Sequence, residues 1–444
     1  MTSGVAAQSS GDGEAWPSQG FDSGNTSYNP TGTPLRADPT QLAQVDVGAA
    51  HRGDYLLADE TLYIHSAENG LGAVEVGSGD LRWQFQEASA PVVPTFVDTP
   101  VVGARALDGP LYGVDLSDGT TTNEVSLGMG RGLGIAADGR WFAPLSEGAV
   151  VAGQASESGL WRTAVEGVPV RPAVADGRVF VSTIEASSEA LDLAFPNEVI
   201  EELDAPGRLY ALDAEDGEIL WEAERVGAGI AAPTARNGRV FWTGDDGDIL
   251  VHDTETGERV WEYKTNGAFH TSPAVANGIV FAGNEDGSLY ALDAETGEQV
   301  ARPSTGAAVR GGPIVVDDIV YWGDQAGTVV ATEVGGGDGG WTFEVEGPVR
   351  AMTAGYGRVV VGTDWAYWVL GEAGSGGETA NGDSDMTSSP DETTVNEGEP
   401  TERQRGFISN GEDEPDFISN GLNMTVLGFL LSVLGILYQM TQGR

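Results

Sequence analysis

Four arginines and one histidine recur at a fixed interval and could together bind an anion. In a 40-residue repeat frame, one equivalent position in each unit is held by Arg52, Pro91, Arg131, Pro169, Ile230, His270, Arg310 and Arg350. Arg171 lies two residues further along its own unit. Guanidinium groups match carboxylates and phosphates, and cations gathered in an anionic protein focus its field on an anion. We therefore expect Arg52, Arg131, Arg171, His270, Arg310 and Arg350 to bind a small polycarboxylate, a phosphate-bearing ligand or an acidic peptide.

A second interpretation of the same residues is purely structural. The chain has 68 acidic and 22 basic residues, so carboxylates are available next to every cation. Each arginine could then form an ion pair with an Asp or Glu of the neighbouring unit. The two interpretations differ in whether the guanidinium groups are free or paired.

Several other chemistries are excluded by composition. The chain has no cysteine, which rules out disulfides, thiol nucleophiles, Cys-ligated zinc, iron–sulfur sites and a lipid-anchored cysteine. Its four histidines are His51, His65, His252 and His270, and they show no metal-ligand spacing. We predict no metal site and no catalytic residues.

The elements that must position the cations are repeats. Residues 211–221 read ALDAEDGEILW, residues 251–261 read VHDTETGERVW, and residues 291–301 read ALDAETGEQVA. Weaker copies occupy residues 73–83, 113–123 and 331–341, and a degenerate copy ends at Trp161. Between the copies, short apolar runs alternate with Asn-Gly and Asp-Gly turns, which indicates β-hairpins. Four short strands in about 40 residues are typical of one propeller blade, and innermost strands line the central channel.

The frame A-x-D-x-x-x-G-x-x-x-W resembles the tryptophan-docking repeat of pyrroloquinoline-quinone propellers. Residues 16–26 (WPSQGFDSGNT) also resemble the lead-in of that family. The family includes quinoprotein alcohol dehydrogenases and the non-enzymatic propeller lipoprotein of the bacterial outer-membrane barrel-assembly machinery. The resemblance implies that Trp83, Trp161, Trp221, Trp261 and Trp341 each dock between neighbouring blades. Asn123 and Ala301 depart from the pattern, so those two contacts should be weaker.

The ends of the repeat region predict how the propeller closes. After Trp341 the chain has material for three strands, and a lone strand over residues 42–47 precedes the first full blade. Pairing these parts removes exposed sheet edges. We therefore predict an all-β fold, an eight-bladed propeller over residues 16–370 with four-stranded blades and a composite last blade. Residues 1–15 should be disordered.

Three segments depart from the blade pattern. Residues 183–207 form an insert between the second and third strands of one blade, on the face of the cationic position, and 196–203 have the spacing of a short helix. Residues 371–421 have the composition of an acidic disordered linker. From Leu422 to Met440 the chain is uncharged and apolar, which predicts a transmembrane helix, followed by a short tail over residues 441–444.

Charge bears on partners and environment. The formal net charge is −46 and Lys264 is the single lysine, which disfavours nucleic-acid binding. This composition is typical of haloarchaeal-type adaptation to high salt; an ordinary acidic protein is the alternative. Acids before the apolar segment and Arg444 after it favour a propeller outside the cytoplasm. The first 23 residues show no signal peptide, so either the start is misassigned or truncated, or the propeller is cytosolic.

The leading functional hypothesis is a membrane-anchored, non-catalytic binding or scaffold propeller with a protein partner or a small anionic ligand. The alternatives are a quinone-dependent dehydrogenase and a ligand sensor. Dehydrogenases of the resembled family use the quinone, commonly a vicinal disulfide, and calcium beside a catalytic Asp. This chain has no cysteine and no evident calcium-binding set, so we expect no cofactor and no enzymatic activity.

Overall fold

The computed structural model describes residues 14–16, 20–46, 55–66, 70–85, 95–98, 101–105, 110–125, 134–154, 157–185, 206–225, 227, 231–335 and 340–372. These residues form strands and turns, and none of them lies in a helix. They all belong to one compact unit, Met1–Ile408. Within the described part of the chain, no helix is long and apolar enough to cross a membrane. The predicted helices at 196–203 and 422–440, nearly all of the linker and the tail at 441–444 lie outside the described residues.

The strands of the described residues fall into eight sheets, each built mainly from strands that follow one another in the chain. The first three sheets are β3 (Tyr55–Ala58), β4 (Thr61–Ser66), β5 (Gly70–Glu75), β6 (Leu81–Phe85); β7 (Thr95–Asp98), β8 (Val101–Arg105), β9 (Leu111–Asp115), β10 (Thr121–Val125); and β11 (Ile135–Ala137), β12 (Arg140–Leu145), β13 (Ala149–Gln154), β14 (Glu157–Ala164). The next two are β15 (Val168–Pro169), β16 (Ala173–Ala175), β17 (Arg178–Ile184), β18 (Gly207–Asp213), β19 (Ile219–Arg225); and β20 (Thr234–Arg236), β21 (Arg239–Thr243), β22 (Asp248–Asp253), β23 (Arg259–Lys264).

The remaining three sheets include the two strands from the beginning of the chain. They are β24 (Ala274–Ala276), β25 (Ile279–Gly283), β26 (Leu289–Asp293), β27 (Gln299–Ala301); β1 (Tyr28–Asn29), β28 (Ile314–Val316), β29 (Ile319–Gly323), β30 (Thr328–Glu333), β31 (Gly340–Glu344); and β2 (Thr40–Asp46), β32 (Ala351–Gly355), β33 (Arg358–Gly362), β34 (Ala366–Gly371). In the last sheet β2 pairs antiparallel with β34, in a register that places Val45 opposite Tyr367. This is the composite closure that the sequence predicts, with β2 running over Thr40–Asp46 rather than 42–47.

The first hairpin turns at an Asn-Gly or Asp-Gly pair in four of the eight sheets. Asn237 and Gly238 have φ values of 51° and 73°, and Asn277 and Gly278 have values of 51° and 78°. Two consecutive residues with positive φ make a type I′ turn, whose twist matches that of the flanking strands. These predicted turns therefore fix where the innermost strands β20 and β24 end.

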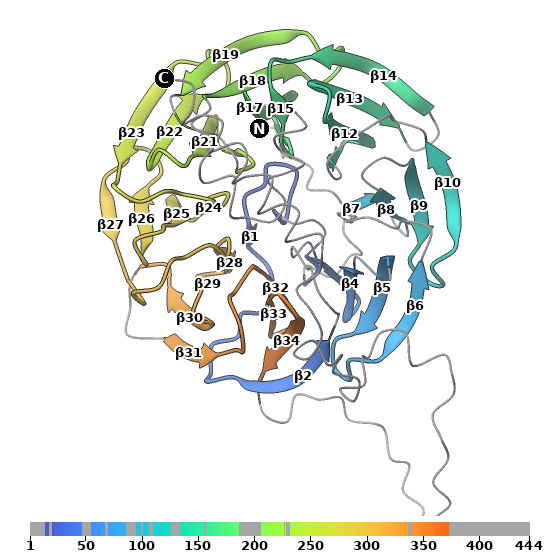
Figure 1. Ribbon diagram of the computed structural model, residues 1–444, viewed down its shortest axis with the longest axis vertical. Helices are drawn as coiled ribbons and strands as arrows, with labels where there is room; N and C mark the ends of the chain where they lie inside the picture. Colours follow the sequence, from blue (N-terminus) through green and yellow to red (C-terminus); the bar gives the residue numbers. More distant parts are fainter. Residues whose placement is uncertain are drawn as a thin grey trace, which may run out of the picture. The chain divides into compact units, whose positions relative to one another are not determined.

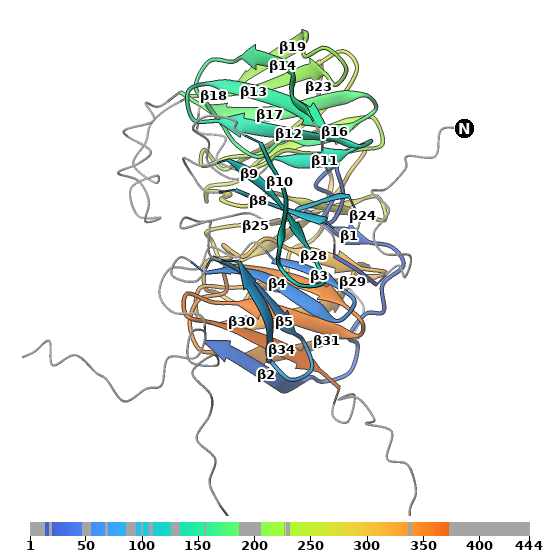
Figure 2. The same ribbon diagram turned by 90° about the vertical axis from the view of Figure 1, so that its right-hand side faces the viewer.

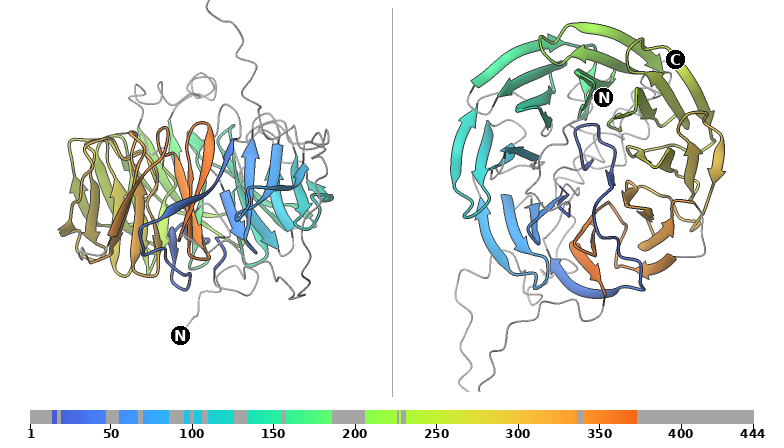
Figure 3. Two further views of the ribbon diagram at one scale, coloured as in Figure 1. Left: turned by 90° about the horizontal axis from the view of Figure 1, so that it is seen from below. Right: turned by 180° about the vertical axis from the view of Figure 1, so that it is seen from behind.

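The sheets are arranged around a central space (Figure 1). Neighbouring innermost strands contact each other in the order β3, β32, β28, β24, β20, β16, β11 and β7. Between β7's sheet and β3's sheet, the indole Nε1 of Trp83 donates a 2.8 Å hydrogen bond to the backbone oxygen of Leu116. The right view of Figure 3 shows the same arrangement from behind, and the edge view of Figure 2 shows the sheets packed side by side. This is a β-propeller architecture.

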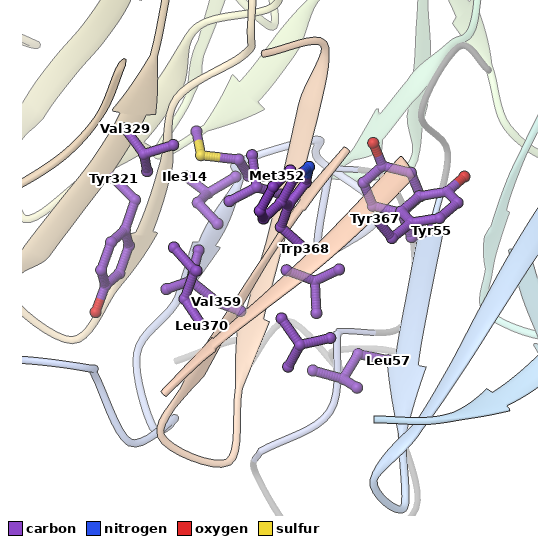
Figure 4. Packing of buried hydrophobic residues seen from close by; sticks show 14 of the residues in the cluster. Tyr55, Leu57, Ile314, Tyr321, Val329, Met352, Val359, Tyr367, Trp368 and Leu370 are labelled. Carbon is purple, nitrogen blue, oxygen red and sulfur yellow. The ribbon is translucent and has the colours of Figure 1, made fainter. Parts of the chain in front are cut away.

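The core lies between the sheets rather than within one layer. One cluster joins Tyr55 and Leu57 of β3, Ile314 of β28, and Met352 and Trp368 of the composite sheet. Figure 4 shows Tyr321 and Val329 on one side of the composite sheet and Tyr55 on the other. The rings of Tyr55 and Tyr367 meet edge to face with centroids 4.6 Å apart. The composite sheet is thus held on both faces by apolar packing.

The segment before β2 runs across the inner strands, and Figure 1 shows β1 inside the ring. Its backbone oxygens accept hydrogen bonds from one innermost strand after another: Ser23 from Val174, Gly24 from Ala235, Thr26 from Val275 and Ser27 from Val315. At its start, Trp16 and Leu57 exchange backbone hydrogen bonds of 2.7 and 3.0 Å. Glu14 accepts a 2.8 Å bond from the Thr33 amide, and Ala15 is buried. The prediction that residues 1–15 are disordered is therefore wrong for Glu14 and Ala15.

Candidate functional site

Four of the eight residues predicted at the channel position can be placed. Pro169, His270, Arg310 and Arg350 are described, whereas Arg52, Pro91, Arg131 and Ile230 lie outside the described residues. His270, Arg310 and Arg350 lie in the connections that precede the innermost strands β24, β28 and β32. The repeat therefore places them at the same end of three consecutive sheets.

Arg310 and His270 share one carboxylate, that of Glu285. Arg310 Nε donates to Glu285 Oε1 at 2.5 Å, and His270 Nε2 lies 3.1 Å from the same oxygen. Glu285 belongs to the turn between β25 and β26, so the pair with Arg310 joins two neighbouring sheets. The side chains are 14–25% exposed. Burial raises the pKa of Glu285, but hydrogen bonds and charge from His270 and Arg310 outweigh it and lower that pKa to about 2.

Arg350 is held in the same way one sheet further along. Its Nε and Nη2 bind the two carboxylate oxygens of Asp364 at 2.6 and 3.1 Å, and its Nη1 donates to Gln325 Oε1 at 3.1 Å. Asp364 and Gln325 occupy the turns that correspond to the Glu285 turn. A bidentate pair of this kind fixes the plane of the guanidinium group.

The expectation of a cationic funnel is therefore wrong for the described residues. Each of His270, Arg310 and Arg350 has a carboxylate partner, and an anion would have to displace Glu285 or Asp364. The purely structural interpretation is the one that these contacts support. The sequence carries the signal: Glu285 and Gln325 each lie 25 residues before the arginine that they contact, as part of the repeat.

Arg171 and Pro169 serve other contacts. Pro169 lies in β15, opposite Thr183 of β17, and Arg171 Nη2 donates to Asn25 Oδ1 of the segment that crosses the ring. Asn25 is fully buried, and its Nδ2 donates to the backbone oxygens of Pro172 and Pro233 at 2.9 and 3.1 Å. Arg171 thus fixes the chain's own N-terminal segment.

The insert begins on the predicted face but later than expected. Thr183 and Gly207 are strand residues, with Ile184 paired to Gly207, so the insert proper starts after Ile184. Because β15 pairs with the same end of β17, the insert emerges beside the connection that leads into the innermost strand. What the insert covers lies outside the described residues.

The five tryptophans named from the repeat all contact the next unit. Each indole Nε1 donates to a backbone oxygen there: Trp83 to Leu116, Trp161 to Ala214, Trp221 to Thr254, Trp261 to Ala294 and Trp341 to Leu35. The first four lie against the turn glycines Gly119, Gly217, Gly257 and Gly297. Trp341 differs because the composite sheet takes its outer strand from the start of the chain, so Leu35 replaces the usual turn.

Trp365 is a residue that the repeat analysis overlooks. It is 60% exposed, more than any other large apolar residue of the described part, and it follows Asp364 in the turn between β33 and β34. The equivalent turns carry Asp286-Gly287 and Ala326-Gly327. The signal in the sequence is a tryptophan where the other units have a small or turn residue.

The residues present do not fit the quinone site of the resembled dehydrogenases. The chain has no cysteine for a vicinal disulfide. Among the described residues, no three His, Asp or Glu side chains are grouped to hold a metal ion. Of the described acids at the channel position, Glu285 and Asp364 are paired with arginines. We therefore derive no reaction step through a quinone.

Comparisons with known proteins agree with the fold. Residues 205–374 match the family described as outer membrane protein assembly factor BamB. The structure of BamB from Moraxella catarrhalis is similar with a TM-score of 0.56 and 16% identity, covering 75% of this chain and 100% of that one. Quinohemoprotein alcohol dehydrogenase from Comamonas testosteroni is similar with a TM-score of 0.61 and 13% identity, covering 81% of each chain. No curated protein sequence matches the chain.

At these identities the structural likeness shows the fold alone, and it extends to a dehydrogenase as well as to BamB. The repeat frame, the docked tryptophans and the matched family point the same way. The match over residues 205–374 and the shared fold together support a PQQ-repeat β-propeller family for this chain.

Proposed function

We propose that the chain is a non-catalytic binding propeller with eight blades, one for each sheet, and that a protein partner docks on the face that carries Trp365. Trp365 is the observation on which this proposal rests. Tryptophan is the residue most enriched among the residues that dominate binding energy at protein interfaces, and arginine is enriched as well. The indole of Trp365 is 60% exposed and is therefore accessible to a partner.

The surroundings of Trp365 support this role. Asp364, directly before it, is held by both guanidinium contacts from Arg350. The Arg350–Asp364 pair holds the backbone of the turn that carries Trp365. Less backbone freedom is therefore lost when a partner binds the indole. Arg310 and Glu285, on the two preceding sheets, provide a further charge pair that can form part of a polar rim.

The test uses the full-length chain immobilised and exposed to a detergent extract of the cells that produce it. Trp365→Ala should lose a protein that the wild type retains at near-stoichiometric yield, and the purified partner should rebind the variant at least tenfold more weakly. Val300→Ala is the matched control, because Val300 is 50% exposed but lies on the outermost strand β27. Equal retention by Trp365→Ala and wild type would contradict the proposal.

We also propose that residues 422–440 tether the propeller to a membrane, with the propeller outside the cytoplasm. The uncharged apolar run supports this proposal. Deleting residues 422–444 should move the protein from the membrane fraction to the soluble fraction. If the protein that lacks residues 422–444 stays in the membrane fraction after washing at high salt, the tether is contradicted.

A further inference from the structure

Three consecutive joints between sheets have residues at two equivalent positions, and the residue types differ from joint to joint. The pair consists of the residue that ends the outermost strand region and the residue that begins the second turn of the next sheet. In the joint before β24 these are Thr265 and Asn284, and in the joint before β28 they are Thr305 and Asp324. The 40-residue repeat relates the two pairs position by position.

In the first of these joints every polar atom of the pair has a partner. Asn284 Nδ2 donates to Thr265 Oγ1 at 3.1 Å and to the backbone oxygen of Gly267 at 2.7 Å. Asn284 Oδ1 accepts from the amide of Asp286 at 3.0 Å. The side-chain amide of Asn284 therefore donates to the oxygen atoms of Thr265 and Gly267 and accepts from the backbone of its own turn.

The backbone of the second joint has the same hydrogen bonds. The Asn284 amide donates to Ser288 and the Asp324 amide to Thr328, both at 3.0 Å. Asp324 Oδ1 accepts from the amides of Ala326 and Thr328 at 2.9 Å, as Asn284 Oδ1 caps its own turn. Asp324 Oδ2 must then lie where Asn284 places its amide nitrogen.

In this joint the donor is replaced by an anionic oxygen. Asp324 is 1% exposed, and neither its Oδ2 nor Thr305 Oγ1 has a hydrogen-bond partner among the described residues. A buried carboxylate oxygen that receives no hydrogen bond is unfavourable unless a positive charge lies beside it.

The joint before β20 shows that this location accepts a cation. There the pair is Arg225 and Gly244, and the guanidinium group of Arg225 occupies the space beside Gly244. Its Nη2 donates to Asp246 Oδ1 and, at 3.1 Å, to the backbone oxygen of Asp248. One joint thus holds a guanidinium and the next an amide NH₂, whereas in the third the equivalent position holds a carboxylate oxygen without a donor.

We propose that Asp324 and Thr305 bind a monovalent metal cation, Na⁺ or K⁺, at the joint before β28. One carboxylate balances one positive charge, and carboxylate and hydroxyl oxygens are hard ligands of the kind that such a cation prefers. Ca²⁺ takes six to eight oxygens and usually several carboxylates, which this joint does not offer. The cation replaces the donor that Asn284 supplies in the neighbouring joint.

The experiment compares thermal unfolding midpoints in NaCl, KCl and choline chloride at one fixed ionic strength, so that general screening is constant. Wild type should unfold at a higher temperature in Na⁺ or K⁺ than in choline, and its midpoint should rise with the logarithm of the metal-ion concentration. Asp324→Asn, which copies the Asn284 joint, should lose this difference and match or exceed the wild-type midpoint in choline. Asp138→Asn, an exposed turn residue, is the control and should keep the wild-type difference.

The reciprocal variant keeps the test decisive if Asp324→Asn folds poorly. Asn284→Asp should be destabilised in choline and should gain a dependence on Na⁺ or K⁺ that the wild-type joint lacks. Equal midpoints in all three chlorides, or an undiminished difference in Asp324→Asn, would overturn the proposal. A wild-type midpoint that rises on acidification with no preference among the chlorides would assign the site to a proton instead.

Discussion

The indole of Trp221 lies directly against the turn glycine Gly257 of the next sheet, and a Cβ atom at Gly257 would be 2.7 Å from Cδ2 of the ring. Gly238, in the same sheet, has nearly the same φ, 73° against 72°, but its Cβ would meet nothing within 4 Å. Substituting alanine at Gly238 therefore introduces backbone strain alone, whereas the same change at Gly257 adds a clash with the docked indole.

Both Gly257→Ala and Gly238→Ala should pay about 1–2 kcal/mol for a left-handed alanine. Gly257→Ala should cost about 1–3 kcal/mol more, because the methyl group pushes Trp221 out of its contact. Urea unfolding of the two variants measures the difference. Equal losses of stability would show that the tryptophan does not dock on this turn.

Replacing a docked tryptophan by alanine should lower the free energy of unfolding, and more so the more deeply the tryptophan is buried. Trp341 is 4% exposed and donates a 2.8 Å bond to Leu35, so Trp341→Ala should cost about 3–5 kcal/mol. Trp221→Ala and Trp261→Ala, at half-buried positions, should cost about 3 kcal/mol each. The exposed Trp365→Ala should cost less than about 1 kcal/mol. Denaturant unfolding tests this order, and losses below about 1 kcal/mol at all three docking sites would contradict the packing.

The ion pairs at the channel position make a prediction about acid. The pKa of Glu285 is about 2 in the folded protein, below its ordinary value of 4.5. A lowered pKa means that its stabilisation is complete above about pH 4.5 and is lost as pH falls towards 2. The melting temperature of wild type should exceed that of Glu285→Gln near neutral pH, and the gap should close across this window. A gap that stays constant from pH 6 to pH 2 would contradict the ion-pair geometry.

Salt should stabilise the propeller through its net charge of −46. Lowering the concentration from molar to millimolar lengthens the screening distance from about 3 Å to tens of ångströms, which restores repulsion among the carboxylates. The melting temperature in choline chloride, which isolates screening from metal binding, should fall steadily with dilution. An unchanged melting temperature would remove the high-salt interpretation of the composition.

The sequence predicts the fold well because the relevant information is local and repeated. Asn-Gly turns such as Asn277-Gly278 fix hairpin positions, and the A-x-D-x-x-x-G-x-x-x-W frame fixes where each tryptophan docks. The pairing of β2 with β34 could be predicted because an unpaired edge at each end had to be satisfied.

The channel position was harder to interpret, because a repeat shows that residues gather but not which partners they choose. The carboxylate partners of Arg310 and Arg350 lie in turns between the second and third strands of a sheet. They can be recognised only when these turns are aligned across the sheets. Trp365 is hidden for the opposite reason: it breaks the repeat. The unpartnered oxygen of Asp324 could not be predicted from the sequence, because it is evident only when the side-chain hydrogen bonds of equivalent positions are compared.

The claim that this PQQ-repeat propeller binds a partner rather than catalyses is tested most directly by reconstitution. The purified chain, incubated with pyrroloquinoline quinone and either Ca²⁺ or a lanthanide ion, should be assayed for alcohol- and sugar-dependent reduction of an artificial electron-acceptor dye. The account predicts a rate equal to that of the protein without quinone, with no saturable binding of the quinone. Substrate-dependent dye reduction that requires both quinone and metal would contradict it.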